Sequence, residues 1–183
     1  MKYFSKMMIA IIALILTMVM SSCGTVQPTT LIVPTALSSV SKVVNMKDLN
    51  LTKDNYQIIN TETAEAVVYY EEFNSGNGFE INEINGEYSL EFKKKDTGGY
   101  NIKYSGIVKC GYLSADDRGI DYNNPYVGDF ARGLAAYRLI NSVQDQGADG
   151  IIEPIITVKV GQDGKRVIYT ATISAKLVKI KTK

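Results

Sequence analysis

Apolar and polar residues alternate along most of the chain from residue 56 onward, and this alternation predicts strands. Two long extended segments, Tyr56–Phe73 and Phe79–Lys94, are rich in aromatic and β-branched residues, and Gly76-Asn77-Gly78 separates them as a turn. A third strand is predicted over Tyr100–Leu113. Within the first segment, Thr63–Tyr70 fits a period of two and partly fits a helical period, and we interpret it as strand.

One long helix is predicted in the second half of the chain. Asn124 can accept hydrogen bonds as the N-cap, Pro125 suits the first turn because its missing amide proton costs nothing there, and Gly147 favours the positive φ that ends many helices. We therefore expect a helix over Pro125–Gln146. Its apolar stripe is wide enough to cover a sheet and consists of Phe130, Ala131, Leu134, Ala136, Tyr137, Leu139, Ile140 and Val143.

The C-terminal part predicts a closing hairpin. Strands over Ile151–Val160 and Lys165–Lys181 are joined by a turn at Gln162-Asp163-Gly164. Pro154 indicates an edge strand or a bulge, because proline cannot donate to a ladder. The last strand buries one face, made of Val167, Tyr169, Ala171, Ile173, Ala175 and Leu177. These elements predict an α+β fold, a twisted and mostly antiparallel sheet of long strands with one long helix packed across it.

The N-terminal segment has the pattern of a bacterial lipoprotein export signal. An unbroken apolar run, Met7–Met20, follows Lys2 and Lys6 and is shorter than the about 20 residues that a membrane helix needs. Two serines lead directly to Cys23, as in a lipobox, although Met stands where Leu is more usual. We predict a signal peptide over residues 1–22 and a diacylglyceryl group on the Cys23 thiol. The alternatives are a conventionally cleaved secretory signal and an uncleaved anchor.

The remainder is expected to comprise a tether and one domain. Residues 23–37 hold the lipidated Cys23 and a flexible segment rich in Thr and Pro, and residues 38–183 form a single domain of ordinary size. Each buried acyl methylene contributes about 0.8 kcal/mol, so Cys23 would hold the chain on the lipid bilayer. We expect an outer membrane lipoprotein, and since no acidic run follows Cys23, we expect it to face the periplasm.

Composition argues against several classes of function. Without residues 1–22 the chain is nearly neutral, whereas nucleic-acid binding needs a basic stripe, and Lys93-Lys94-Lys95 is interpreted as a solvated strand end. The chain has 0 His, which removes Ser-His-Asp and Cys-His catalysis and histidine metal sites. Cys110, the thiol left after acylation, is expected to be a buried core residue. We predict no nucleic-acid partner, catalytic residue, metal or cofactor.

Carboxylates and tyrosines are the remaining candidates for chemistry or binding. Adjacent Glu71 and Glu72 would face opposite sides of a strand, whereas a glycosidase needs two carboxylates about 5–10 Å apart. The polar loop Asp116–Asn124 offers oxygen ligands for calcium but lacks the EF-hand spacing, and helix capping accounts for it equally well. Three glutamates can gather near a turn: Glu80, Glu83 and Glu87. Six tyrosines suit either a binding surface or half-buried strand positions: Tyr69, Tyr70, Tyr88, Tyr100, Tyr122 and Tyr126.

The order of these elements carries a resemblance. The long hairpin, the helix, its exit Gly147-Ala148-Asp149-Gly150-Ile151-Ile152 and the closing hairpin resemble uncharacterised small lipoproteins of Bacteroides-type bacteria. The half from Asn124 onward resembles compact β-α-β-β envelope domains. The resemblance implies a cell-envelope protein and supplies no site residues. We expect a non-enzymatic module that binds another envelope protein or associates with itself, and the alternative is a carboxylate-dependent glycan hydrolase or accessory enzyme.

Overall fold

The structure is a computed structural model that describes residues 38–42, 52–113, 119–122 and 124–181. These residues belong to one compact unit of the chain, Val33–Lys183. The predicted signal peptide, Cys23 and the tether lie outside the described residues. The described elements are β1 (Ser38–Lys42), a short 3-10 helix η2 (Lys53–Asn55), β2 (Tyr56–Glu72), β3 (Gly78–Glu83), β4 (Tyr88–Lys94), β5 (Tyr100–Gly106), β6 (Val108–Tyr112), α2 (Val127–Asp145), β7 (Gly150–Asp163) and β8 (Arg166–Ile180).

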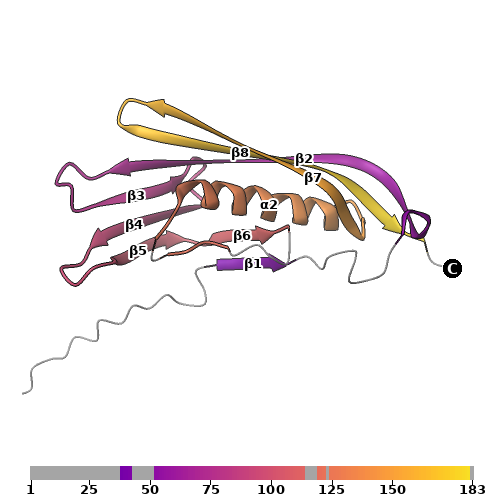
Figure 1. The fold of residues 1–183 in the computed structure, drawn as a ribbon, viewed down its shortest axis with the longest axis horizontal. Coiled ribbons are helices and arrows are strands. Elements are labelled where there is room, and N and C mark those ends of the chain that lie inside the picture. Colours follow the sequence, from indigo (N-terminus) through magenta and orange to yellow (C-terminus); the bar gives the residue numbers. More distant parts are fainter. Residues whose placement is uncertain (1–37, 43–51, 114–118, 123, 182–183) are drawn as a thin grey trace, which may run out of the picture. The chain divides into compact units, whose positions relative to one another are not determined.

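Six strands form an antiparallel sheet in the order β5-β4-β3-β2-β8-β7. Helix α2 packs against β2 and β8, and it also packs against β6, which pairs in parallel with β1. Figure 1 shows α2 between the long strands β2 and β8 and the β1–β6 pair. The predicted α+β class, with a mostly antiparallel sheet and one helix packed across it, is confirmed.

Two predicted strands are each divided in the structure. The predicted strand Phe79–Lys94 forms β3 and β4, because the chain turns at residues 84–87, where Gly86 has φ +77. The predicted strand Tyr100–Leu113 forms β5 and β6, because Gly106 at φ +79 redirects the chain towards β1. A single strand over Tyr100–Leu113 would place Tyr104 and Cys110 on one face, but in the structure Tyr104 lies on β5 and Cys110 on β6. The interpretation of Thr63–Tyr70 as strand is confirmed by β2.

The helix begins and ends slightly inside the predicted range. It spans Val127–Asp145 instead of Pro125–Gln146, and its N-cap is Tyr126, whose backbone is extended, instead of Asn124. Pro125 therefore lies just before the N-cap and not in the first turn of the helix. Gly147 follows the helix at φ +65, as predicted. The predicted stripe is buried apart from Tyr137, which is half-buried.

The core lies between α2 and the sheet. Phe92 stacks on Phe79 with ring centroids 4.7 Å apart, and Phe130 of α2 meets Phe92 edge-on at 6.5 Å. Four of the six residues predicted for the buried face of β8 are fully enclosed, while Val167 and Tyr169 are half-buried. The helix therefore covers the middle of β8 more completely than its beginning.

The closing hairpin has the predicted edge strand. β7 pairs with β8 and is the last strand in the order of the sheet. Its pairing register shifts between Ile152 and Ile155, and Glu153 has φ +51 at this bulge. Pro154 therefore marks both an edge strand and a bulge, the two possibilities that its position predicted.

Candidate functional site

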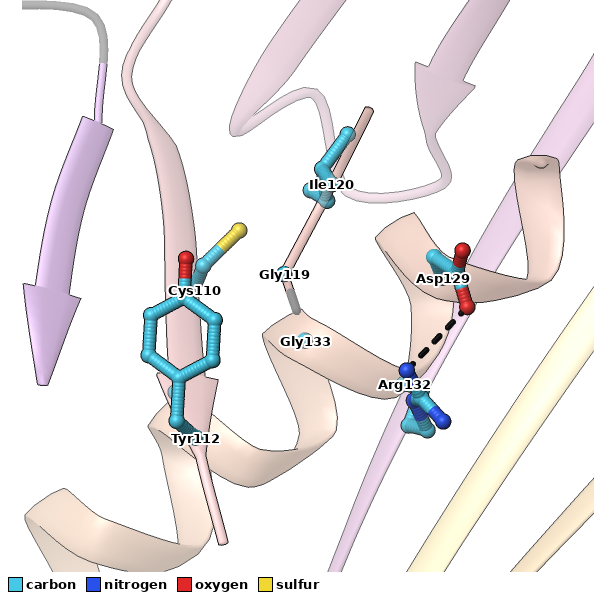
Figure 2. A pocket seen from close by; sticks show the side chains of 8 residues that line it. Cys110, Tyr112, Gly119, Ile120, Asp129, Arg132 and Gly133 are labelled. Carbon is cyan, nitrogen blue, oxygen red and sulfur yellow. Dashed lines mark ion pairs between the residues drawn. The ribbon is translucent and has the colours of Figure 1, made fainter. Parts of the chain in front are cut away.

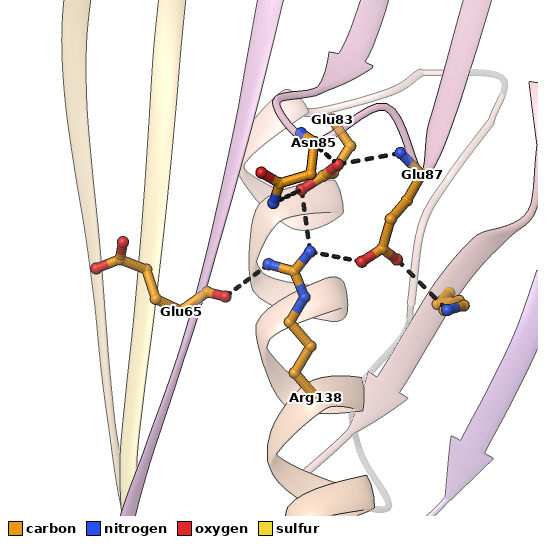
Figure 3. A network of polar contacts seen from close by, with 6 residues as sticks. Glu65, Glu83, Asn85, Glu87 and Arg138 are labelled. Atoms are coloured by element: carbon orange, nitrogen blue, oxygen red, sulfur yellow. Dashed lines mark hydrogen bonds and ion pairs between the residues drawn. The ribbon is translucent and has the colours of Figure 1, made fainter.

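Arg138 of α2 connects the helix to the sheet through two glutamates (Figure 3). Its Nη2 donates to Glu83 Oε1 at 3.0 Å and to Glu87 Oε1 at 2.8 Å, and its Nη1 donates to the main-chain oxygen of Glu65 at 2.8 Å. The Glu83 side chain is 0% exposed, and its Oε2 also accepts from the main-chain N–H of Asn85 at 2.7 Å and of Glu87 at 3.1 Å. The structure thus brings together Glu83 and Glu87, two of the three glutamates that the sequence singled out.

The other acidic candidates lie elsewhere. Glu80 alternates with buried residues of β3, so it lies on the face of the sheet away from α2. In the strand register it comes directly opposite Glu71 of β2. Glu71 accepts from Arg166 Nε at 2.8 Å. Glu72 pairs with Phe79, which belongs to the core, so Glu71 and Glu72 face opposite sides of the sheet as predicted. These residues do not form a carboxylate pair across a cleft.

The electrostatics of the Arg138 cluster favour the ionised form of Glu87. Burial would raise the pKa of Glu87, but the hydrogen bond and charge of Arg138, together with Lys109, hold this pKa below its ordinary value of 4.5. Burial alone would lower the pKa of Arg138, but its bonds to the two glutamates raise it. A general acid requires a carboxyl group with a raised pKa. The pKa values of Glu91, Asp149 and Glu153 are also lowered, each by hydrogen bonds that its carboxylate accepts. The Arg138 cluster is suited to joining α2 to the sheet.

A small pocket adjoins Cys110, between β6 and α2 (Figure 2). Cys110 is 4% exposed, as predicted for a core thiol, and a Cβ at Gly133 of α2 would lie 3.2 Å from its sulfur. Asp129 and Arg132 form an ion pair at 3.2 Å at the edge of the pocket. Its cavity volume is about 10 Å³, which is at most the space of about one water molecule. This pocket does not have room for a sugar or a peptide side chain.

The predicted calcium loop Asp116–Asn124 is described only in part, because residues 114–118 and 123 lie outside the described residues. Within the described part, the Asn124 N–H donates to Asp121 Oδ1 at 3.3 Å, an arrangement common where a chain turns towards a helix. Among the residues that the structure describes, no group of three or more Asp, Glu, Cys or His side chains is placed to hold a metal ion.

The six tyrosines that the sequence singled out differ in exposure. Tyr88 is buried and Tyr126 is exposed. The exposed Tyr126 contacts the ring of Tyr169 on β8 at 6.1 Å, edge-on. Tyr69, Tyr70 and Tyr100 are half-buried on strands, as strand propensity predicts, and Tyr122 is half-buried before α2, with its ring centroid 5.9 Å from that of Phe130. Most of these rings therefore support the sheet, and Tyr126 is the member that extends an exposed surface.

That surface is the outer part of β7. Every residue from Glu153 to Asp163 is exposed, although the segment contains four large apolar side chains. Ile156, Val158 and Val160 pair with Ile173, Ala171 and Tyr169 of β8, so they lie on the same face of the sheet as α2 but beyond its cover. We call these three residues the β7 strip. Figure 1 shows the hairpin of β7 and β8 continuing past the N-terminal end of α2.

The sequence contained part of this signal. The alternation over Ile151–Val160 and the position of Pro154 predicted an apolar edge strand. They did not predict that the segment from Glu153 onward would be exposed on both faces, because that depends on how far α2 reaches across the sheet towards β7.

Comparison with family models, with curated proteins and with solved structures finds no match for this chain. No helix in the described part of the chain is long and apolar enough to cross a membrane. The lipoprotein signal, Cys23 and the resemblance to envelope lipoproteins remain predictions from the sequence.

Proposed function

We propose that this chain is a membrane-anchored lipoprotein of the outer membrane, facing the periplasm, whose domain is a non-enzymatic binding or assembly module of the cell envelope. The anchor is proposed from Cys23 and the segment before it. The binding role is supported above all by the β7 strip, a row of apolar side chains on an edge strand. A long exposed apolar edge strand is a template for pairing with another chain unless something covers it.

The acidic groups of the described chain support this role over glycan hydrolysis. The alternative function requires two carboxylates across a cleft, one of them with a raised pKa. Glu83 and Glu87 are bound to the same guanidinium, and the pKa of Glu87 is lowered. The pocket beside Cys110 has a volume of only about 10 Å³. We therefore do not propose the hydrolase.

Binding through an edge strand has a definite physical basis. The outer strand of a sheet has N–H and C=O groups that a further strand can satisfy, and alternate side chains then supply specificity. The three side chains of the β7 strip face one side of the sheet, next to Tyr169 and the exposed Tyr126, whereas Ile155 faces the other side. A partner strand would cover these side chains as well as the open edge. The main-chain hydrogen bonds and the apolar contacts would both be made by β7, and neither α2 nor the Arg138 cluster would take part in them.

Photocrosslinking in cells tests this role. A photoreactive amino acid is placed at Val160, which is 59% exposed, and in a second chain at Ile84, an equally apolar turn residue that is 57% exposed. We expect a covalent adduct from Val160 and none from Ile84. A Cys23→Ser version of the Val160 chain is expected to lose the adduct, because the anchor would no longer place the domain beside its partner. Equal adducts from both positions, or none from Val160, would refute a binding role for β7.

A further inference from the structure

We propose that β7 pairs antiparallel with β7 of a second copy of this chain, with Val158 on the two-fold axis. The pairing would join two six-stranded sheets edge to edge and cover both β7 strips. This inference rests on the proposed function, because it names the partner of the same surface.

The turn of the hairpin determines which main-chain groups of β7 are available. Gly164 and Lys165 form a two-residue turn, and Gly164 has φ +60, as the first position of a type II′ turn requires. The pair that closes this turn, Asp163 and Arg166, exchanges main-chain hydrogen bonds, and such pairs alternate along an antiparallel ladder. The N–H and C=O groups of Ile156, Val158, Val160 and Gln162 therefore point away from β8, towards the open edge.

The apolar side chains and the outward main-chain groups belong to the same residues. With Val158 opposite Val158 of the second copy, Ile156 comes opposite Val160 of the second copy, and Val160 opposite Ile156. Each facing pair exchanges two hydrogen bonds, so the three pairs form about six. All six apolar side chains lie on one face of the joined sheet, because directly opposite residues share a face. The segment is thus complementary to itself in this register.

Neighbouring registers are less favourable. A shift that places Lys159 on the two-fold axis puts two ammonium groups directly opposite each other, which is destabilising. A shift in the other direction places Pro154, which has no N–H to donate, opposite Val160. In the proposed register Lys159 comes opposite Thr157. Glu153 comes opposite Asp163, but the Glu153 carboxylate is already neutralised by Lys176 Nζ at 2.6 Å.

The size of the contact also fits two copies on one membrane. The segment from Pro154 to Gln162 is about 30 Å long, and one pair of edge strands gives an interface at the low end of specific contacts. Such a contact is weak between freely diffusing molecules. Two chains anchored by Cys23 in the same bilayer would be held at a raised effective concentration, which converts a weak pairing into a populated dimer.

Disulfide trapping tests both the partner and the register. Val158→Cys, Ile156→Cys and Val160→Cys are each made in the full-length chain and oxidised with diamide in the membrane, with the wild-type chain as control for Cys23 and Cys110. Val158→Cys is expected to form a dimer, because its Cα atoms would lie about 5.5 Å apart. Val160→Cys alone is expected not to, because its own copies would lie about 13 Å apart. A mixture of the Ile156→Cys and Val160→Cys chains is expected to crosslink.

A charge variant supplies an independent readout. Val158→Lys would place two ammonium groups on the two-fold axis and is expected to raise the dimer dissociation constant of the full chain, reconstituted in lipid vesicles, more than about tenfold. Ile84→Lys adds the same charge at an exposed apolar position outside β7 and is expected to leave the dissociation constant unchanged.

The outcomes separate this inference from the proposed function. Crosslinking of Val160→Cys alone as efficiently as Val158→Cys would overturn the register. Absence of a Val158→Cys dimer, with a Val160 photoadduct that contains a different protein, would overturn self-pairing and leave the binding role intact. Absence of both the dimer and any photoadduct would overturn both.

Discussion

Removing Arg138 is expected to destabilise the protein more than removing any exposed ion pair. Arg138→Met removes the donors to Glu83 and Glu87 and leaves the Glu83 carboxylate, whose side chain is 0% exposed, without its cation. Breaking a buried pair in this way costs about 3–5 kcal/mol. Because Arg138 is 27% exposed and water can reach part of the site, we expect about 3 kcal/mol. With an m value of about 2 kcal/mol/M, the urea midpoint would fall by about 1.5 M.

The matched control is Arg166→Met, since Arg166 is 52% exposed and bonds Glu71 at the surface. This change is expected to cost no more than about 1 kcal/mol. Adding Glu83→Gln to Arg138→Met should recover about 1 kcal/mol, because the double variant no longer buries an uncompensated charge. Urea unfolding of the four proteins at pH 7, followed by circular dichroism, measures these differences. An Arg138→Met cost equal to that of Arg166→Met, or a double variant that is the least stable, would refute the reasoning.

Further predictions concern pH and packing. The pKa of Glu87 in the folded protein lies below its ordinary value of 4.5. The contribution of Glu87 to stability is therefore present above that pH and is lost as the pH falls through the folded pKa. Between pH 6 and pH 3, the urea midpoint should fall less steeply in Arg138→Met than in wild type. Gly111→Ala is expected to cost about 1–3 kcal/mol, because its Cβ would lie 2.5 Å from a main-chain nitrogen of α2, while Gly161→Ala, with nothing within 4 Å, should change the urea midpoint little. Phe92→Ala is expected to cost about 3–5 kcal/mol in the same assay, since its ring is fully buried between β3 and α2; a loss below about 1 kcal/mol would contradict that packing.

Local patterns were sufficient to predict the class of fold. The alternation of β8 and the three- and four-residue spacing of the apolar stripe on α2 both report which face of an element is buried, and those predictions agree with the structure. Gly147 and Pro154 were also interpretable from sequence, because a positive φ and a missing N–H are properties of single residues. The division of Phe79–Lys94 was missed although Asn85-Gly86 is a local hairpin signal, since the apolar pattern continues across it.

The sites depended on contacts between residues far apart in sequence. Arg138 meets Glu83 across 55 positions, and nothing in the local sequence of either residue indicates the other. The exposure of the β7 strip is likewise a tertiary property, because apolar alternation shows only that a strand has an apolar face. Whether that face is covered depends on the reach of α2 over the neighbouring strands. The sequence by itself thus determined the periodicity of each element and predicted the address of the chain, and the tertiary structure decided which carboxylates are neutralised and which apolar edge is left open for a partner.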